Sequence, residues 1–264
     1  MTARSFDQRW ADAVQDELRA LADRPAAAPE LTEADLVDLP APVRRYVMAS
    51  GAVGRPVPRT MRLAFDAVMR RKPGESGMSS SSVQVNGFGS RPVRLFLMKA
   101  RMFGLPVRAL HLYRGDEATF QVRVASLATI VDLAGDEISR AETVTVLNDL
   151  CVFAPGVLAG ARLTWRAIDD RTAAVTFTNG RWTVGATLLF NERDELVDFW
   201  SDDRPESADG GLVPRRWSTP LSDYRVIDGR RLPTRGTAVY ARPEGPLAYG
   251  EFTLRSIAYD AAAA

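Results

Sequence analysis

The chain has 264 residues, of which 46% are hydrophobic and 25% charged, a balance typical of folded globular proteins that excludes disordered and fibrous chains. Lysine and arginine number 34 against 33 aspartate and glutamate residues, so the formal net charge of +1 gives no sign of a nucleic-acid partner. One cysteine and one histidine exclude zinc, iron–sulfur and Cys–His catalytic sites, and we expect neither a metal nor a cofactor.

The N-terminal part of the chain is predicted to be helical. Apolar residues recur at helical spacing over 5–24, and a second helix is predicted after Pro40 and before Gly51. We expect residues 1–58 to form a helical segment that packs on the remainder. The start of the chain has no apolar signal core, and no window approaches the ~18–20 apolar residues of a membrane span. These features predict a cytoplasmic protein without stable membrane insertion.

From residue 59 the pattern changes to a period of two, as in Met61, Leu63 and Phe65, which predicts strands. The predicted strands are 61–69, 78–88, 92–102, 107–114, 117–125, 162–168, 172–178, 181–190, 196–203, 215–227, 234–242 and 248–259. Most connectors are short turns, whereas parallel neighbours would need crossovers of about a dozen residues. The sequence therefore predicts an antiparallel meander.

A helix is predicted to interrupt this meander within 126–160, where Ser139 and Glu142 have the spacing of a capping box. The predicted fold class is α+β: a large curved antiparallel sheet or open barrel of about a dozen strands, with the N-terminal and central helices against its concave face. Residues 59–264 would form this part of a single structural domain. Such a sheet predicts an apolar pocket of a few hundred Å³ or more, lined by methionine and aromatic side chains.

Three residues are the candidate catalytic groups. Lys99 lies in the most apolar strand, VRLFLMKARMF, where both faces look buried, so we expect its amine in the cavity, paired or neutral; a lysine that reaches water is the alternative. His111 is the only imidazole and either shuttles a proton or is a hydrogen-bonded core residue. Asp149 is either an acid or base at the cavity margin or a solvent-facing helix residue.

The candidate ligand-binding residues are aromatic, sulfur-containing or acidic side chains on predicted strands: Met98, Tyr113, Trp200, Asp202, Trp217, Tyr240 and Glu251. Core packing, or salt bridges at the surface, is the alternative for most of them. The chain has no glycine-rich phosphate loop that opens a helix, no GxSxG elbow and no HExxH motif. Nucleotide-dependent, serine-hydrolase and zinc chemistry are therefore not expected.

Three blocks of sequence carry a family resemblance: LPAPVRRYVMASGAVGRPVPRT, the KARM at 99–102, and W-x5-DYR-x3-G-x3-PT from Trp217 to Thr234. Over about residues 38–259 the chain resembles an uncharacterised actinobacterial family, a domain of unknown function. It is also similar in expected shape to LolA-like half-barrels that carry lipids. The resemblance implies a cavity for an apolar ligand and brings no established activity.

Two functions follow from the predicted cavity. The first is a cofactor-independent enzyme that binds an apolar molecule, such as a polyketide-like intermediate, and promotes cyclisation, isomerisation or dehydration by positioning and a few polar groups. The alternative is a non-catalytic carrier of a lipid or another hydrophobic ligand, and a structural interaction domain comes third. The expected partner is an apolar small molecule, and the sequence indicates no oligomeric state.

Overall fold

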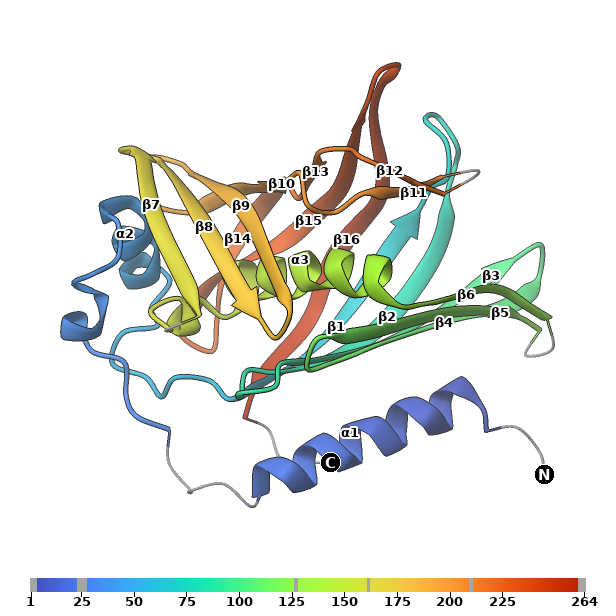
Figure 1. The fold of residues 1–264 in the computed structure, drawn as a ribbon, viewed down its shortest axis with the longest axis horizontal. Helices are drawn as coiled ribbons and strands as arrows, with labels where there is room; N and C mark the ends of the chain where they lie inside the picture. The colour runs from blue at the N-terminus through green and yellow to red at the C-terminus, as the bar shows by residue number, and fades with distance from the viewer. Residues whose placement is uncertain (1–3, 23–27, 126–127, 161, 209–210, 261–264) are drawn as a thin grey trace.

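The computed structural model describes the chain except for residues 1–3, 23–27, 126–127, 161, 209–210 and 261–264 (Figure 1). The helices are α1 (Phe6–Ala22), α2 (Ala41–Ala49) and α3 (Asp136–Phe153), with short 3-10 turns η1 (Glu33–Leu36) and η2 (Pro155–Val157). No helix in these described ranges is long and apolar enough to cross a membrane.

Strands make up about half of the chain. Those before α3 are β1 (Thr60–Met69), β2 (Met78–Gly87), β3 (Val93–Met102), β4 (Leu105–Arg114), β5 (Glu117–Val124) and β6 (Ala128–Ala134). Those after it are β7 (Leu163–Asp169), β8 (Thr172–Asn179), β9 (Trp182–Phe190), β10 (Leu196–Ser201), β11 (Glu206–Ala208), β12 (Gly211–Val213), β13 (Trp217–Ser218), β14 (Leu221–Ile227), β15 (Arg230–Arg242) and β16 (Gly245–Tyr259).

One antiparallel sheet contains 14 of these strands, in the order β6-β5-β4-β3-β2-β1-β16-β15-β13-β10-β9-β8-β7, with β14 paired to β15. The first and last long strands meet in the middle, where β1 pairs with β16. The two edges, β6 and β7, are therefore consecutive strands joined through α3. The sheet curves, and α3 runs across its concave side from one edge to the other (Figure 1). This confirms the predicted α+β open barrel.

Helices α2 and α3 pack together in the largest apolar cluster, against β8, β9 and β10. The Tyr46 hydroxyl of α2 donates a 2.7 Å hydrogen bond to the Cys151 carbonyl of α3, and both residues are almost completely buried. Because α3 is buried on all sides, even its polar residues, such as Glu142, Asn148 and Asp149, are buried and need partners inside the protein. The one cysteine is thus a core residue.

Helix α1 lies on the other face of the sheet, below β3 and β4 in Figure 1. Its Val14 packs against Val85 and Leu95, and the Trp10 indole donates to the Leu95 carbonyl at 3.3 Å. The amphipathic period of 5–24 correctly predicts a helix with one buried stripe. It does not identify the face of the sheet, and the expectation that this N-terminal helix lies on the concave face is wrong.

Two sequence blocks that carry the family resemblance meet at one corner of the fold. The turn between β14 and β15 contains Gly229 at φ +72°, and the loop after α2 approaches it closely. A Cβ atom at Gly51 would lie 2.6 Å from the Gly229 carbonyl oxygen, and the Arg231 amide donates to the Ser50 carbonyl at 2.9 Å. These glycines allow backbone-to-backbone packing that a side chain would prevent.

Three strand boundaries differ from the prediction. The interlude 126–160 begins with the edge strand β6 before its helix, because Ala128–Ala134 continues the meander beside β5. The predicted strand 215–227 is divided into β13 and β14, both paired with β15. The short hairpin of β11 and β12 stands apart from the main sheet. The predicted division at residue 58 stays a prediction.

Candidate functional site

A cavity of about 550 Å³ lies between the concave face of the sheet and α3. Its walls are mostly apolar and include Phe65, Met69, Phe96, Met98, Phe120 and Phe252. The predicted apolar pocket with methionine and aromatic walls is therefore confirmed. Of the residues predicted to form the site, His111, Asp149, Met98, Trp217 and Tyr240 line this cavity.

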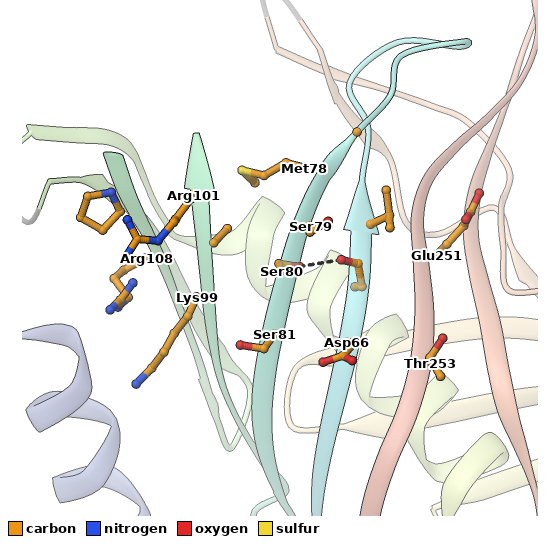
Figure 2. Close-up of a pocket in the computed structure, with 15 residues that line it drawn as sticks. Asp66, Met78, Ser79, Ser80, Ser81, Lys99, Arg101, Arg108, Glu251 and Thr253 are labelled. Carbon is orange, nitrogen blue, oxygen red and sulfur yellow. Dashed lines mark hydrogen bonds between the residues drawn. The ribbon is translucent and has the colours of Figure 1, made fainter. Parts of the chain in front are cut away.

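Lys99 does not reach the cavity, so the position predicted for it is wrong. On β3, Arg94 and Met98 face the cavity, while Leu97 and Lys99 face α1. Figure 2 shows Lys99 beside an open groove on this outer face, extending toward α1, where its amine pairs with Asp7. Its side chain is 44% exposed. Both faces of β3 look buried in the sequence because α1 covers one of them.

Three predicted ligand-binding residues near the sheet surface lie outside the cavity. Trp200 and Asp202 belong to a surface cluster around Arg216, whose guanidinium stacks on the indole at 3.8 Å and donates two 3.0 Å hydrogen bonds to Asp202. Glu251 lies on the outer groove of Figure 2 and pairs with Arg70 at 2.7 Å. Arginine partners at the surface therefore account for both carboxylates.

Tyr113 is also outside the cavity, although it shares the strand parity of His111 on β4. It is fully buried in the main core, where its hydroxyl lies 2.9 Å from Thr143 Oγ1 and accepts a 2.7 Å hydrogen bond from Asn179 Nδ2. The strand continues past the cavity into the packed end of the half-barrel. Tyr113 is thus a satisfied core residue.

The polar part of the cavity starts at Asp149 on α3. Its Oδ2 atom accepts hydrogen bonds from Gln84 Nε2 at 2.8 Å, Asn86 Nδ2 at 3.0 Å and Arg94 Nε at 2.8 Å. Arg94 also donates to Gln84 Oε1 at 2.9 Å. Burial raises the pKa of Asp149, against the opposing effect of Arg94. Asp149 therefore holds the β2 and β3 side chains in place under α3.

Glu142 lies two turns earlier on α3 and is 2% exposed. Its Oε1 atom is 3.4 Å from Arg204 Nη2, and its Oε2 atom is 3.8 Å from Arg94 Nη1 and 3.4 Å from His111 Nε2. Burial favours the neutral acid, but His111, Arg204 and Arg94 outweigh it and lower the pKa of Glu142. Glu142 is thus held as a buried carboxylate between two arginines.

His111 faces Glu142 from β4 and is 7% exposed. Its Nδ1 atom lies 3.4 Å from Arg94 Nη1. Because arginine only donates, Nδ1 is the acceptor and the proton of the neutral ring sits on Nε2. Burial, aided by Arg94 and Arg204 and opposed by Glu142, lowers the pKa of His111 from 6.5 to about 4. A neutral imidazole with an N–H donor therefore faces a carboxylate.

These two groups leave hydrogen-bonding capacity unused. Among the described residues, His111 Nε2 and Glu142 Oε2 are buried and have no hydrogen-bond partner, since the contact between them lacks hydrogen-bond geometry. Buried polar atoms without partners are uncommon and costly. Both residues line the cavity, so a ligand group that displaces the atoms covering His111 Nε2 and Glu142 Oε2 can satisfy the two atoms together.

The depressed pKa of His111 predicts a specific pH dependence of stability. The unfolded chain binds a proton at this histidine below about pH 6.5, whereas the folded protein does so only near pH 4. The free energy of unfolding therefore decreases as the pH is lowered from 6.5 to about 4. The shift corresponds to about 3 kcal/mol. Because His111 is the only histidine, His111→Gln removes this contribution.

Urea unfolding of both proteins between pH 7 and pH 4 measures the effect. We expect the stability difference, wild type minus His111→Gln, to fall by about 3 kcal/mol as the pH falls. Effects of the surface acids, which both proteins share and which do not contact His111, cancel in this difference. Parallel stability curves would show that the imidazole is not buried in the neutral form.

The wall above Glu142 is built around Arg204. Its Nε atom donates to Thr145 Oγ1 at 3.0 Å, a further N–H group donates to the Tyr240 hydroxyl, and its guanidinium lies 4.6 Å from the centre of the Trp217 ring. Cation–π contact stabilises such an arrangement, and the attraction is stronger because the cation is removed from water. Within the described ranges, no three His, Cys, Asp or Glu side chains gather as metal ligands would.

The model of a family of unknown function, DUF6544, matches residues 29–252. The chain belongs to the DUF6544 family. The resemblance drawn from the sequence blocks is thereby confirmed, and none of the curated proteins matches the chain.

Three solved structures are similar to this DUF6544 chain. A DUF1329 family protein from Desulfovibrio piger has a TM-score of 0.45 and 11% identity, over 89% of this chain and 96% of that one. A putative outer membrane lipoprotein-sorting protein domain from Vibrio parahaemolyticus has a TM-score of 0.44 and 8% identity, over 78% and 87%. A LolA superfamily protein from Nitrosomonas europaea has a TM-score of 0.38 and 11% identity, over 83% and 94%.

Several cavity residues of the DUF6544 chain were not predicted: Gln84, Arg94, Glu142, Asn148 and Arg204. The sequence contains a pattern that could have identified two of them. Arg94 alternates with apolar neighbours inside a strand, and Glu142 lies in the apolar helix that ends in VLNDLCVF. Charged residues in such positions require buried partners. Arg204 follows β10 in a loop, and nothing in its local sequence distinguishes it from a surface arginine.

Proposed function

We propose that this DUF6544 protein binds an apolar small molecule that carries a hydroxyl group, and holds it in the cavity between the sheet and α3. The observation that carries the proposal is the pair of unsatisfied buried atoms, His111 Nε2 and Glu142 Oε2, in a cavity with apolar walls. A hydroxyl oxygen accepts from the imidazole N–H while its proton is donated to the carboxylate.

The charges around the pair favour a neutral ligand. Arg94 and Arg204 balance Glu142 and Asp149, and His111 is uncharged near pH 7. A ligand with its own charge would add an uncompensated charge to a buried site, which is costly. The apolar walls stabilise the rest of the ligand by removing its surface from water. The proposed occupant is therefore neutral and largely apolar, with one polar end.

A matched pair of ligands tests this proposal. A fatty alcohol and its methyl ether can each displace the fluorescent apolar probe N-phenylnaphthylamine, and only the alcohol donates a proton to Glu142. An unmade buried hydrogen bond costs about 1–3 kcal/mol, so we expect the alcohol to bind about tenfold more tightly. Glu142→Leu, which removes the acceptor that only the alcohol uses, should abolish that preference, whereas His111→Phe, which removes the donor that both ligands use, should weaken the binding of both.

Ser207→Ala is the matched control, because Ser207 lines the cavity away from the pair and its loss should leave the preference unchanged. Equal affinity of the wild-type protein for alcohol and ether would contradict the assigned role of His111 and Glu142. Retention of the preference in Glu142→Leu would contradict it as well.

A cofactor-independent enzyme is the second candidate, and the same pair supports it. Glu142 as a carboxylate can accept a proton, and the neutral His111 can donate a hydrogen bond from Nε2–H to an oxygen on which negative charge develops, which are roles that cyclisation, isomerisation or dehydration of a bound ligand can use. A carrier releases its ligand chemically unchanged, whereas an enzyme releases a product. Mass spectrometry of a ligand recovered after incubation separates the two. For this second candidate we also propose that the protein is cytoplasmic and that its ligand is polyketide-like.

A further inference from the structure

The hairpin between β3 and β4 has an unusual tip. Met102 pairs with Leu105, so Phe103 and Gly104 form a two-residue turn, with φ angles of +51° and +80°. Turns with positive φ at both central residues strongly prefer asparagine, aspartate or glycine at the first position. Phenylalanine is a strained choice there. The fold alone gives no reason for an aromatic residue at this position.

Burial does not compensate for this strain, because Phe103 is 94% exposed. Leu105, next to the turn, is a further exposed apolar side chain at 51%, and Ile130, two strands away from β4 on β6, is 56% exposed. Ile130 lies near the start of β6, which runs beside β5 at the same edge of the half-barrel. The tip therefore presents a protruding ring with apolar neighbours to the surroundings.

Basic side chains accompany this tip. Ser80 pairs with Ala100, so the hairpin 70–77 and the β3–β4 hairpin lie at the same end of these strands. Arg71 and Lys72 in that hairpin are exposed, and Arg101 precedes the tip on β3 (Figure 2). Counting Arg70, four basic residues stand against the two acidic residues Glu75 and Glu251. This end of the strands thus has a net positive charge beside its exposed apolar groups.

The same end of the strands adjoins the cavity. Met69 and Met98 are the last residues of β1 and β3 that line it, and the chain continues from them into the hairpin 70–77 and the Phe103 tip. Both methionines are half-buried, whereas Arg94 at the other end of β3 is buried. An apolar molecule that leaves or enters the cavity over the ends of these strands passes beside the exposed tip.

We propose that the surface formed by the hairpin 70–77 and the Phe103 tip docks on an anionic lipid bilayer. Phe103 enters the interfacial layer, and Arg71, Lys72 and Arg101 face lipid phosphates. An aromatic ring with flanking basic residues is suited to that boundary. A stable protein contact needs about 800 Å² on each side, whereas this tip offers a single ring and scattered apolar neighbours. The proposal goes beyond the proposed function and does not depend on it.

Co-sedimentation with vesicles tests the docking, using the full chain without added ligand. The vesicles contain three parts phosphatidylcholine to one part phosphatidylglycerol, and pure phosphatidylcholine serves for comparison. We expect the wild-type protein to bind the anionic vesicles and to bind neutral ones much more weakly. Arg101→Gln should reduce the partition coefficient about fivefold, the effect of about 1 kcal/mol per basic residue.

Phe103→Asn is the decisive variant. Asparagine tolerates the left-handed conformation, so this protein should fold with at least wild-type stability and lose about tenfold or more of its vesicle binding. Val226→Asn is the control, because Val226 is 68% exposed on β14 and its loss should leave binding unchanged.

Unchanged binding by Phe103→Asn would overturn the proposal. A wild-type chain that ignores both kinds of vesicle would do so too, and would leave the tip as a contact surface for a protein. Neither outcome bears on whether the cavity holds a ligand, so the docking and the proposed function fail independently.

Discussion

Arg94→Met is expected to destabilise the folded protein by about 3–5 kcal/mol, the cost of leaving a buried charge without its partner. Arg94 is 9% exposed, donates to Asp149 at 2.8 Å and lies 3.8 Å from Glu142. Without its guanidinium, two carboxyl groups share a buried region, so one of them must be protonated or solvated. Thermal unfolding should show a midpoint lower by about 10 °C or more.

Two further variants make this result specific. Arg101→Met alters an exposed arginine of the same strand and should change stability by less than about 0.5 kcal/mol. Adding Asp149→Leu to Arg94→Met removes one of the stranded carboxyl groups and should recover part of the loss. If Arg94→Met is no more destabilised than Arg101→Met, the charges beneath α3 are not buried in the way described.

The period of two predicts most of the sheet correctly because nearly every strand has one apolar face and turns follow directly. The same signal cannot say what covers each face. On β3 the sequence shows apolar residues at both parities, and the choice of Lys99 as the buried cation depends on that pattern. Since α1 supplies the apolar cover on one side, Lys99 reaches Asp7, and the buried cation is Arg94, five residues earlier.

The central helix shows a similar limit. Ser139 and Glu142 have capping-box spacing, but α3 begins at Asp136, and the Ser139 hydroxyl donates to the Gly135 carbonyl and accepts from the Ala118 amide. The capping-box interpretation is therefore wrong. Glu142 instead faces Arg204, which lies 62 residues later in the chain. Such partners come together only when the sheet curves around α3, and the local sequence around each residue does not encode that curvature.

Filling the cavity gives the most direct test of the account. Ala238 and Ala241 lie on β15: Ala238 is 6% exposed and lines the cavity, whereas Ala241 is exposed. An indole at position 238 occupies space that a ligand needs, while one at position 241 projects to solvent. The measurement is a titration of wild-type protein, Ala238→Trp and Ala241→Trp with N-phenylnaphthylamine, each variant first shown to unfold cooperatively. We expect wild type and Ala241→Trp to bind alike and Ala238→Trp to bind about 100-fold more weakly, a difference of about 2.7 kcal/mol. Equal binding by all three proteins, or no binding by the wild type, would contradict a ligand site in this cavity.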